Sequence, residues 1–126
     1  MPSQNNSGQQ FSKRFAIPIV ATVALLANRI VAYDGGYATT AGGVKDAQGV
    51  TESDAAINDA VSAVTDYSYL VEASVAIAFG DYVKPAADGT GRAALGTLTD
   101  HCGRALGAAT AAGQLFEMQI VRHVHA

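Results

Sequence analysis

Short apolar segments separated by turn residues fill the chain from Asn28 onward. β-Branched and aromatic residues are enriched within the segments, whereas glycine and aspartate are frequent between them. β-Branched and aromatic residues favour the extended backbone of a strand, and glycine tolerates the positive φ of tight turns. Many short strands at near-regular turn spacing are typical of barrels and sandwiches. The pattern therefore predicts an all-β fold, a small β-barrel or β-sandwich of short antiparallel strands.

The positions of the turns predict where the strands lie. Residues 60–66 and 67–72 each alternate between apolar and polar positions, so we expect two strands that pair with each other. Residues 53–60 and 74–79 are ambiguous, because each is also compatible with a helical turn. The remaining strands are expected at residues 29–33, 37–40, 44–50, 82–84, 92–95, 101–106 and 115–122.

The first 27 residues differ in composition from the rest. Residues 1–12 are rich in glutamine, asparagine and serine, so burial of their side chains cannot offset the entropy lost on ordering them. Residues 15–27 are almost entirely apolar. We therefore divide the chain into an extended N-terminal arm, residues 1–27, with a polar tail and an apolar segment, and a β-rich body, residues 28–126. The tail is either a frayed terminus or a segment that orders against a neighbouring subunit.

The apolar segment of the arm is too short to span a membrane. A spanning helix needs about 20 consecutive apolar residues, and residues 15–27 fall short of that length. A cleaved signal peptide is also disfavoured, because small residues do not lie at the usual spacing before Asn28. We expect an apolar strand or a partner-binding segment here, and no membrane partner.

Length and charge narrow the class of protein further. The chain has 126 residues, of which 49% are apolar, enough for one domain with one core. Residues 1–33 hold three of the eight basic residues and none of the 11 acidic ones, so the body is acidic. Phosphate binding depends on clustered lysine and arginine. Direct binding to nucleic acid is therefore not expected.

The sequence lacks the residue patterns of common enzyme sites. The glycines at 89, 91 and 96 do not have the spacing of a phosphate-binding loop, and no serine lies in a nucleophile elbow. His101 and the only cysteine, Cys102, are adjacent, so a strand points them to opposite faces. The acidic residues are scattered, as in turns and caps. We therefore predict no catalytic residues, no cofactor and no enzymatic activity, and a buried, inert thiol.

His123 and His125 are the best candidates for metal ligands. In a strand, positions two apart place both imidazoles on one face. Two ligands are too few for a structural zinc site, which takes four. We therefore expect a solvent-facing pair near the end of the chain and no metal site, with a site shared across an oligomer axis as the alternative.

A series of short motifs lies in a fixed order between residues 44 and 121. They are Gly49-Val50, Glu52-Ser53-Asp54-Ala55, Val71-Glu72-Ala73, Gly80-Asp81-x-Val83, Ala87-Asp88-Gly89-x-Gly91-Arg92, Gly103-Arg104-Ala105-Leu106 and Gly113-x-Leu115-x-Glu117. In this order they resemble small capsid cement or decoration proteins encoded by tailed phages. The resemblance implies a compact β-rich body on the outside of the expanded icosahedral head.

The resemblance also implies partners and a location. It implies a structural virion protein on the outer surface of the capsid, bound to the major capsid protein. Cement proteins commonly sit at local threefold or twofold positions, so a homo-oligomer is implied, with a trimer favoured over a dimer. We expect the arm to make the intersubunit contacts through apolar side chains, namely Phe11, Phe15, Ile17, Ile19, Val20, Leu25 and Leu26.

Other classes of function remain open from the residues alone. The small β-rich body also suits a secreted or surface binding module, such as a carbohydrate-binding domain. A small enzyme or metal-dependent domain requires a metal or a polar pocket in the structure. Another phage part, such as a tail protein or a head-fibre base, is the last alternative.

Overall fold

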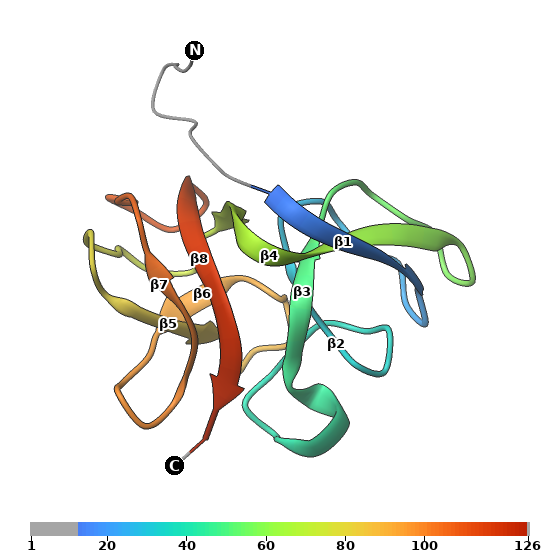
Figure 1. Cartoon of the computed structure of the whole chain (residues 1–126), viewed down its shortest axis with the longest axis horizontal. Helices are drawn as coiled ribbons and strands as arrows, with labels where there is room; N and C mark the ends of the chain where they lie inside the picture. The colour runs from blue at the N-terminus through green and yellow to red at the C-terminus, as the bar shows by residue number, and fades with distance from the viewer. Residues whose placement is uncertain (1–12, 126) are drawn as a thin grey trace.

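The computed structural model describes residues 13–125, which form strands joined by turns and loops (Figure 1). The described residues contain no α-helix and one short 3₁₀ turn, η1 (Gly43–Lys45). The strands are β1 (Lys13–Val20), β2 (Ile30–Ala32), β3 (Ala47–Thr51), β4 (Ala60–Glu72), β5 (Tyr82–Pro85), β6 (Ala93–Leu95), β7 (His101–Ala105) and β8 (Leu115–Val124). The paired strands run antiparallel, which confirms the all-β fold expected from the sequence.

The strands form a single curved sheet in the order β2-β3-β4-β8-β7-β5-β6, with β1 paired to β4 outside this path. The 13-residue β4 joins the two halves of the sheet. Its first half pairs with β1, from Ala16 opposite Val64 to Val20 opposite Ala60. Its second half pairs with β8, between residues 68–72 and 115–119. The first half of β4 also pairs with β3, at Ala63 and Val64, so β4 has different neighbours along its length.

The prediction of two paired strands at residues 60–66 and 67–72 is wrong, because the structure has the single strand β4 there. This segment contains neither glycine nor proline, so the backbone has no residue that favours a reversal. The helical turns considered at residues 53–60 and 74–79 are also absent from the described structure. These segments are bends and turns with isolated bridges, Leu25 to Ala55 and Ile77 to Ala109.

Three further segments differ from the predicted strands. Residues 37–40 form no strand, and only Tyr37 makes an isolated bridge, to Val31. The start of the strand expected at 44–50 lies in η1, and β3 begins only at Ala47. The strand expected at 82–84 extends by one residue to Pro85, which ends β5.

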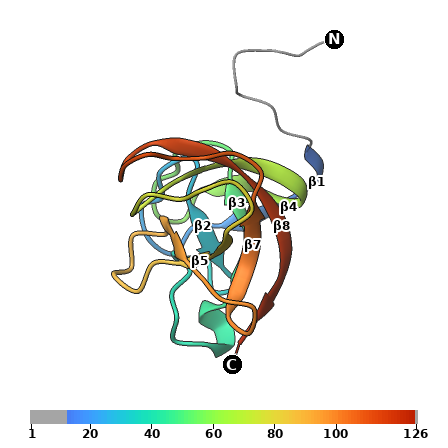
Figure 2. The same cartoon turned by 90° about the vertical axis from the view of Figure 1, so that its left-hand side faces the viewer.

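The sheet curves until its two ends approach each other, which gives a nearly closed barrel (Figure 2). The Ile30 N–H of β2 donates to the carbonyl oxygen of Gly91, just before β6, at 2.7 Å. Gly91 has a φ of 72°, and a Cβ built there would lie 2.4 Å from Cδ1 of Tyr37. Only glycine fits this close approach. Glu72 reinforces it with ion pairs to Arg29 at 3.2 Å and Arg92 at 3.6 Å.

Two apolar clusters fill the part of the molecule that the structure describes. The larger occupies the barrel and includes Ile30, Val50, Val71, Val83 and Met118, each no more than 1% exposed. The smaller lies beside β1, β2 and β4 and consists of Ala21, Leu25, Val31, Val61 and Ala63. Residues on both sides of the expected division at residue 27 therefore share one cluster.

Cys102 is also in the larger cluster, at 1% exposure, as expected for an inert thiol. Burial raises the pKa of this thiol to about 12, so the nucleophilic thiolate is strongly disfavoured in the folded state.

Within the described part of the chain, none of the helical segments is long and apolar enough to cross a membrane.

Candidate functional sites

The strand β1 lies at an edge of the sheet, since β4 is its only partner among the described strands (Figure 1). Phe15 is 66% exposed and Val20 is 60% exposed, whereas Ile17 and Ile19 are half-buried. Pro18 has no N–H to donate to a ladder, which fits an edge position. An edge strand offers unpaired backbone groups that can accept a strand of another chain.

A charged contact attaches the start of β1 to the sheet. The Lys13 ammonium lies 2.7 Å from Oε2 of Glu52, which directly follows β3. The Ser62 hydroxyl of β4 donates to Oε1 of the same carboxylate at 2.6 Å. Hydrogen bonds from Lys13 and Ser62 hold the pKa of Glu52 below its usual range. Glu52 therefore joins β1, β3 and β4.

The loop after β1 is packed on a second loop, residues 53–59. The backbones of Leu25 and Ala55 exchange two hydrogen bonds, at 2.8 and 2.9 Å. The side chain of Leu25 is 2% exposed, whereas Leu26 is 49% exposed. Val23 and Ile57 are also exposed on these loops. We call the exposed apolar residues of β1 and the two loops the edge surface; they are Phe15, Val20, Val23, Leu26 and Ile57.

The structure thus separates the residues expected at the interface. Phe15, Val20 and Leu26 lie on the edge surface, and Leu25 is buried in the chain's own smaller cluster. Phe11 lies outside the described residues. Sequence reasoning missed Ile57, because its contribution depends on the packing of two loops that are distant in sequence.

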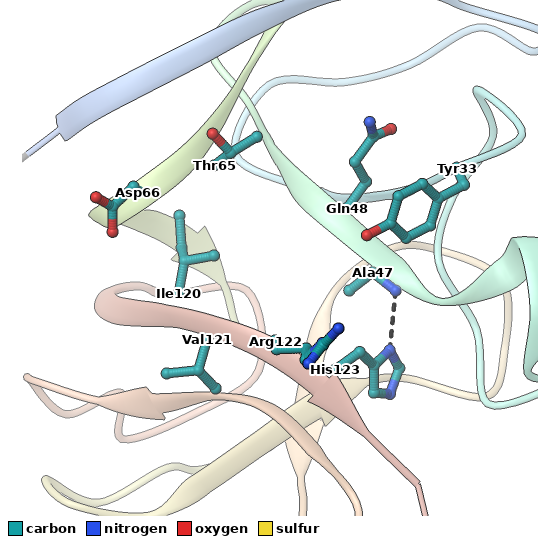
Figure 3. A pocket seen from close by; sticks show the side chains of 9 residues that line it. All are labelled: Tyr33, Ala47, Gln48, Thr65, Asp66, Ile120, Val121, Arg122 and His123. Atoms are coloured by element: carbon teal, nitrogen blue, oxygen red, sulfur yellow. Dashed lines mark hydrogen bonds between the residues drawn. The ribbon is translucent and has the colours of Figure 1, made fainter.

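A hollow of about 460 Å³ lies between β3 and β8 (Figure 3). It forms because β4 pairs with β3 through its first half and with β8 through its second, and the described β3 and β8 have no ladder between them. Its lining combines one aromatic ring with polar side chains and with the apolar Ile120 and Val121. The aromatic and polar members are Tyr33, Gln48, Thr65, Asp66, Arg122 and His123.

At the end of β8, the rings of His123 and His125 stack with their centroids 4.2 Å apart. This confirms that the two imidazoles share a face. The expected solvent-facing pair is wrong for His123, whose side chain is only 2% exposed. The residue is covered because the start of β3 lies over it, where the Ala47 N–H donates to Nδ1 of His123 at 2.9 Å.

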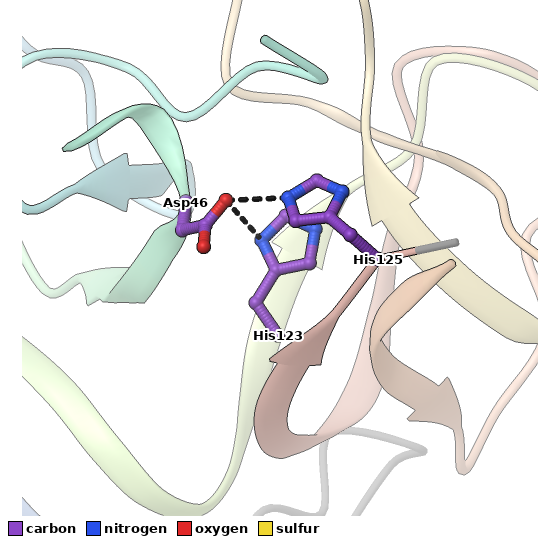
Figure 4. A group of neighbouring side chains, drawn as sticks. All are labelled: Asp46, His123 and His125. Atoms are coloured by element: carbon purple, nitrogen blue, oxygen red, sulfur yellow. Dashed lines mark hydrogen bonds and ion pairs between the residues drawn. The ribbon is translucent and has the colours of Figure 1, made fainter. Parts of the chain in front are cut away.

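Asp46 also contacts both rings, although sequence reasoning did not connect it with them (Figure 4). It lies 79 positions before His125, so no local spacing could have indicated the contact. The 3₁₀ turn η1 places Asp46 directly ahead of β3. The loop between β2 and β3 therefore supplies the third member of this group.

No protein-family model matches the chain, and no curated protein matches it in sequence. Among solved structures, the chain is similar to the N base of head fiber gp8.5 from bacteriophage phi29. The TM-score is 0.69 at 20% sequence identity, and the match covers 89% of this chain and 98% of the other. The sequence motifs that resemble small phage head proteins thus occur on a fold that is also found in a phage head fiber.

Proposed function

We propose that this chain is a structural protein of a phage head, attached to the outer surface of the shell that the major capsid protein forms. The fold shared with the N base of the phi29 head fiber carries the proposal. The order of the sequence motifs supports it independently, because they resemble capsid cement and decoration proteins. In this role the chain stabilises the expanded head as a cement protein.

The edge surface supplies the contacts that such a role needs. A cement subunit requires a rigid body that buries apolar area across seams between shell proteins. Phe15 and Val20 are large, exposed and carried on an edge strand, so they are suited to anchor such a contact. Each contact is modest, but many symmetric sites together resist the internal pressure of the packaged DNA.

We also propose that the chain acts as a homo-oligomer, with a trimer favoured over a dimer. Closed symmetry suits a protein surface that contacts the same surface on another copy. A symmetric oligomer would also present several edge surfaces to the shell at once. Analytical ultracentrifugation of the purified chain checks this part. A sedimenting species of three chains supports it, and a monomer at high micromolar concentration contradicts it.

The central experiment is co-sedimentation with expanded phage heads that lack this protein. We expect saturable binding at a fixed ratio to the shell protein, and heads that retain their DNA at a higher temperature. Phe15→Asp and Val20→Asp should weaken binding about tenfold or more, because a charge then enters an apolar contact. Leu98→Asp is the matched control, since Leu98 is 68% exposed but lies between β6 and β7, outside the edge surface as defined.

Two results would contradict the proposal at different levels. The absence of binding to both expanded and unexpanded heads would remove the capsid role altogether. Saturable binding without any gain in head stability would replace the cement role with that of a base that only attaches another structure.

The hollow between β3 and β8 supports a second candidate, a surface binding module for saccharides. Tyr33 is 63% exposed, and amide, carboxylate and guanidinium groups lie around the same hollow (Figure 3). An aromatic face with a few polar groups is a common arrangement in small-ligand sites. Titration with host cell-wall saccharides, monitored by NMR shifts of Gln48 and Arg122, tests it. Unchanged spectra at millimolar saccharide would exclude it.

A further inference from the structure

Four ionisable side chains from three parts of the chain meet at the end of β8. Asp46 precedes β3, Asp100 precedes β7, and His123 and His125 lie in or just after β8. Oδ1 of Asp46 is hydrogen-bonded to Nε2 of His125 and lies 3.8 Å from Nδ1 of His123. Oδ1 of Asp100 lies 3.8 Å from Nε2 of His123 and 3.6 Å from Nδ1 of His125. Each imidazole therefore faces Asp46 with one nitrogen and Asp100 with the other.

The hydrogen bonds determine which nitrogen of His123 carries a proton. The Ala47 N–H donates to Nδ1 of His123, so this nitrogen presents its lone pair. In the neutral ring the proton then resides on Nε2, on the side of Asp100. Nδ1 of His123 thus directs a lone pair toward Asp46, and Nε2 directs an N–H toward the Asp100 carboxylate. Histidines that bind metals have this arrangement, in which one nitrogen binds the ion and the other donates to a carboxylate.

A second observation is that the contact between His123 and Asp100 lacks a hydrogen bond. The side chain of His123 is 2% exposed, and its Nε2 is buried without a hydrogen-bond partner among residues 13–125. Oδ1 of Asp100, which faces it, is also buried and has no hydrogen-bond partner within the same described range. Unpaired buried polar atoms are destabilising, and those in folded proteins commonly mark an ion, a water molecule or a function.

We propose that Asp46 Oδ1, His123 Nδ1 and His125 Nε2 bind one divalent transition-metal ion of the zinc type. One ligand atom from each of Asp46, His123 and His125 lies within 4.8 Å of the other two (Figure 4). Ligands about 2.0–2.2 Å from zinc in a tetrahedral site are about 3.3–3.5 Å apart, so small side-chain rotations bring them into place. The ion takes the place of the proton between His125 and Asp46, and the neutral ring of His125 then carries its one proton on Nδ1, the nitrogen that faces Asp100. The ion also displaces the Ala47 N–H from Nδ1 of His123.

Asp100 completes the site without touching the ion. When the metal withdraws electron density from the rings, their outer N–H groups become stronger donors, and both face Oδ1 of Asp100. The other oxygen of Asp100 lies 3.3 Å from the Lys84 ammonium. Three protein ligands leave a fourth position for water or for a group of a binding partner. The ion therefore holds the end of β8 against the loop before β3, independently of the capsid role.

The test is metal titration of the full chain, produced without an affinity tag and treated with a chelator. We expect calorimetry to show one Zn²⁺ per chain, Co²⁺ to give the visible absorption of a tetrahedral site, and Zn²⁺ to raise Tm by several degrees. Asp46→Asn and His125→Gln should weaken Zn²⁺ binding by about tenfold or more. The His125 side chain is 31% exposed at the end of the chain, so its replacement leaves the core intact.

His101→Gln is the matched control. This third histidine bonds through Nδ1 to the Thr97 carbonyl at 3.0 Å and lies against the Tyr82 ring, outside the proposed ligand set. The His101→Gln variant should bind Zn²⁺ with the same affinity as the unaltered chain. Equal affinity in His125→Gln and His101→Gln would overturn the site, as would the absence of binding and of any Tm shift at millimolar Zn²⁺.

Discussion

At the scale of single residues, Thr51 shows how one buried hydroxyl connects segments of the chain. Thr51 is fully buried at the end of β3. Its Oγ1 donates to the carbonyl oxygen of Leu26 at 2.7 Å and accepts the N–H of Arg29 at 3.1 Å. The segment between β1 and β2 is thereby attached to β3 from inside the molecule.

The first prediction concerns this hydroxyl. Thr51→Val keeps the shape of the side chain but leaves the Leu26 carbonyl and the Arg29 N–H without this partner. We expect the free energy of unfolding to fall by about 2 kcal/mol, the typical cost of leaving buried polar groups unpaired. Urea denaturation measures it. Thr51→Ser retains the hydroxyl and should cost less; if both variants cost the same, the hydrogen bonds are not what stabilises this position.

At the scale of elements, β1 is held to the sheet by its ladder with β4 and by the contact of Lys13 with Glu52. The pKa of Glu52 is lower in the folded chain than in the unfolded one, chiefly through its hydrogen bond with Lys13. Such a group adds stability above its unfolded pKa, and the gain disappears as the pH falls through the folded pKa. The attachment of β1 is therefore sensitive to acid.

The second prediction concerns the pH dependence of the stability that Glu52 contributes. Above the usual glutamate pKa of about 4.3, Glu52→Gln should be less stable than the unaltered chain, and the difference should shrink as the pH falls below it. Denaturant unfolding between pH 7 and pH 2.5 measures both curves. Lys13→Met should reduce the same difference, because it removes the main cause of the lowered pKa. Parallel curves at all pH values would contradict the prediction.

Local turn residues allowed much of the fold to be predicted from the sequence. The strands near residues 29–33 and 101–106 end where glycine or aspartate follows, and the structure places β2 and β7 there. The break that the alternation predicts between residues 66 and 67 is absent, because β4 continues through a segment with neither glycine nor proline. A strand that changes partners halfway has no signature in its own residues.

The candidate sites depend on pairings between distant segments, so the sequence revealed only parts of them. The apolar run of residues 15–27 predicts interface roles for Phe15 and Val20, and the structure leaves both side chains exposed. Leu25 lies in the same run but turns inward, because the loop of residues 53–59 pairs with its backbone. Asp46 meets His125 only because the fold brings the start of β3 over the end of β8, where the Ala47 N–H donates to His123.

At the scale of the whole molecule, β1 and the loop after it belong to the folded unit. Ala21 and Leu25 lie in the smaller apolar cluster with Val31, Val61 and Ala63. Ile19 packs against the same cluster from β1. A division of the chain at residue 27 would therefore separate the two sides of this cluster.

The third prediction uses three truncated chains to locate the boundary of this unit. Residues 13–126 lack only the polar tail, whose composition cannot offset the entropy lost on ordering, so we expect the Tm of the full chain. Residues 21–126 lose the ladder of β1 and should melt lower. Residues 28–126 also lose Leu25, whose burial alone is comparable to the roughly 2–5 kcal/mol cost of a Leu→Ala substitution in a core. This shortest chain should therefore be the least stable in calorimetry. If it instead melts like the full chain, the arm ends at residue 27, and the cluster beside β1 contributes little to folding.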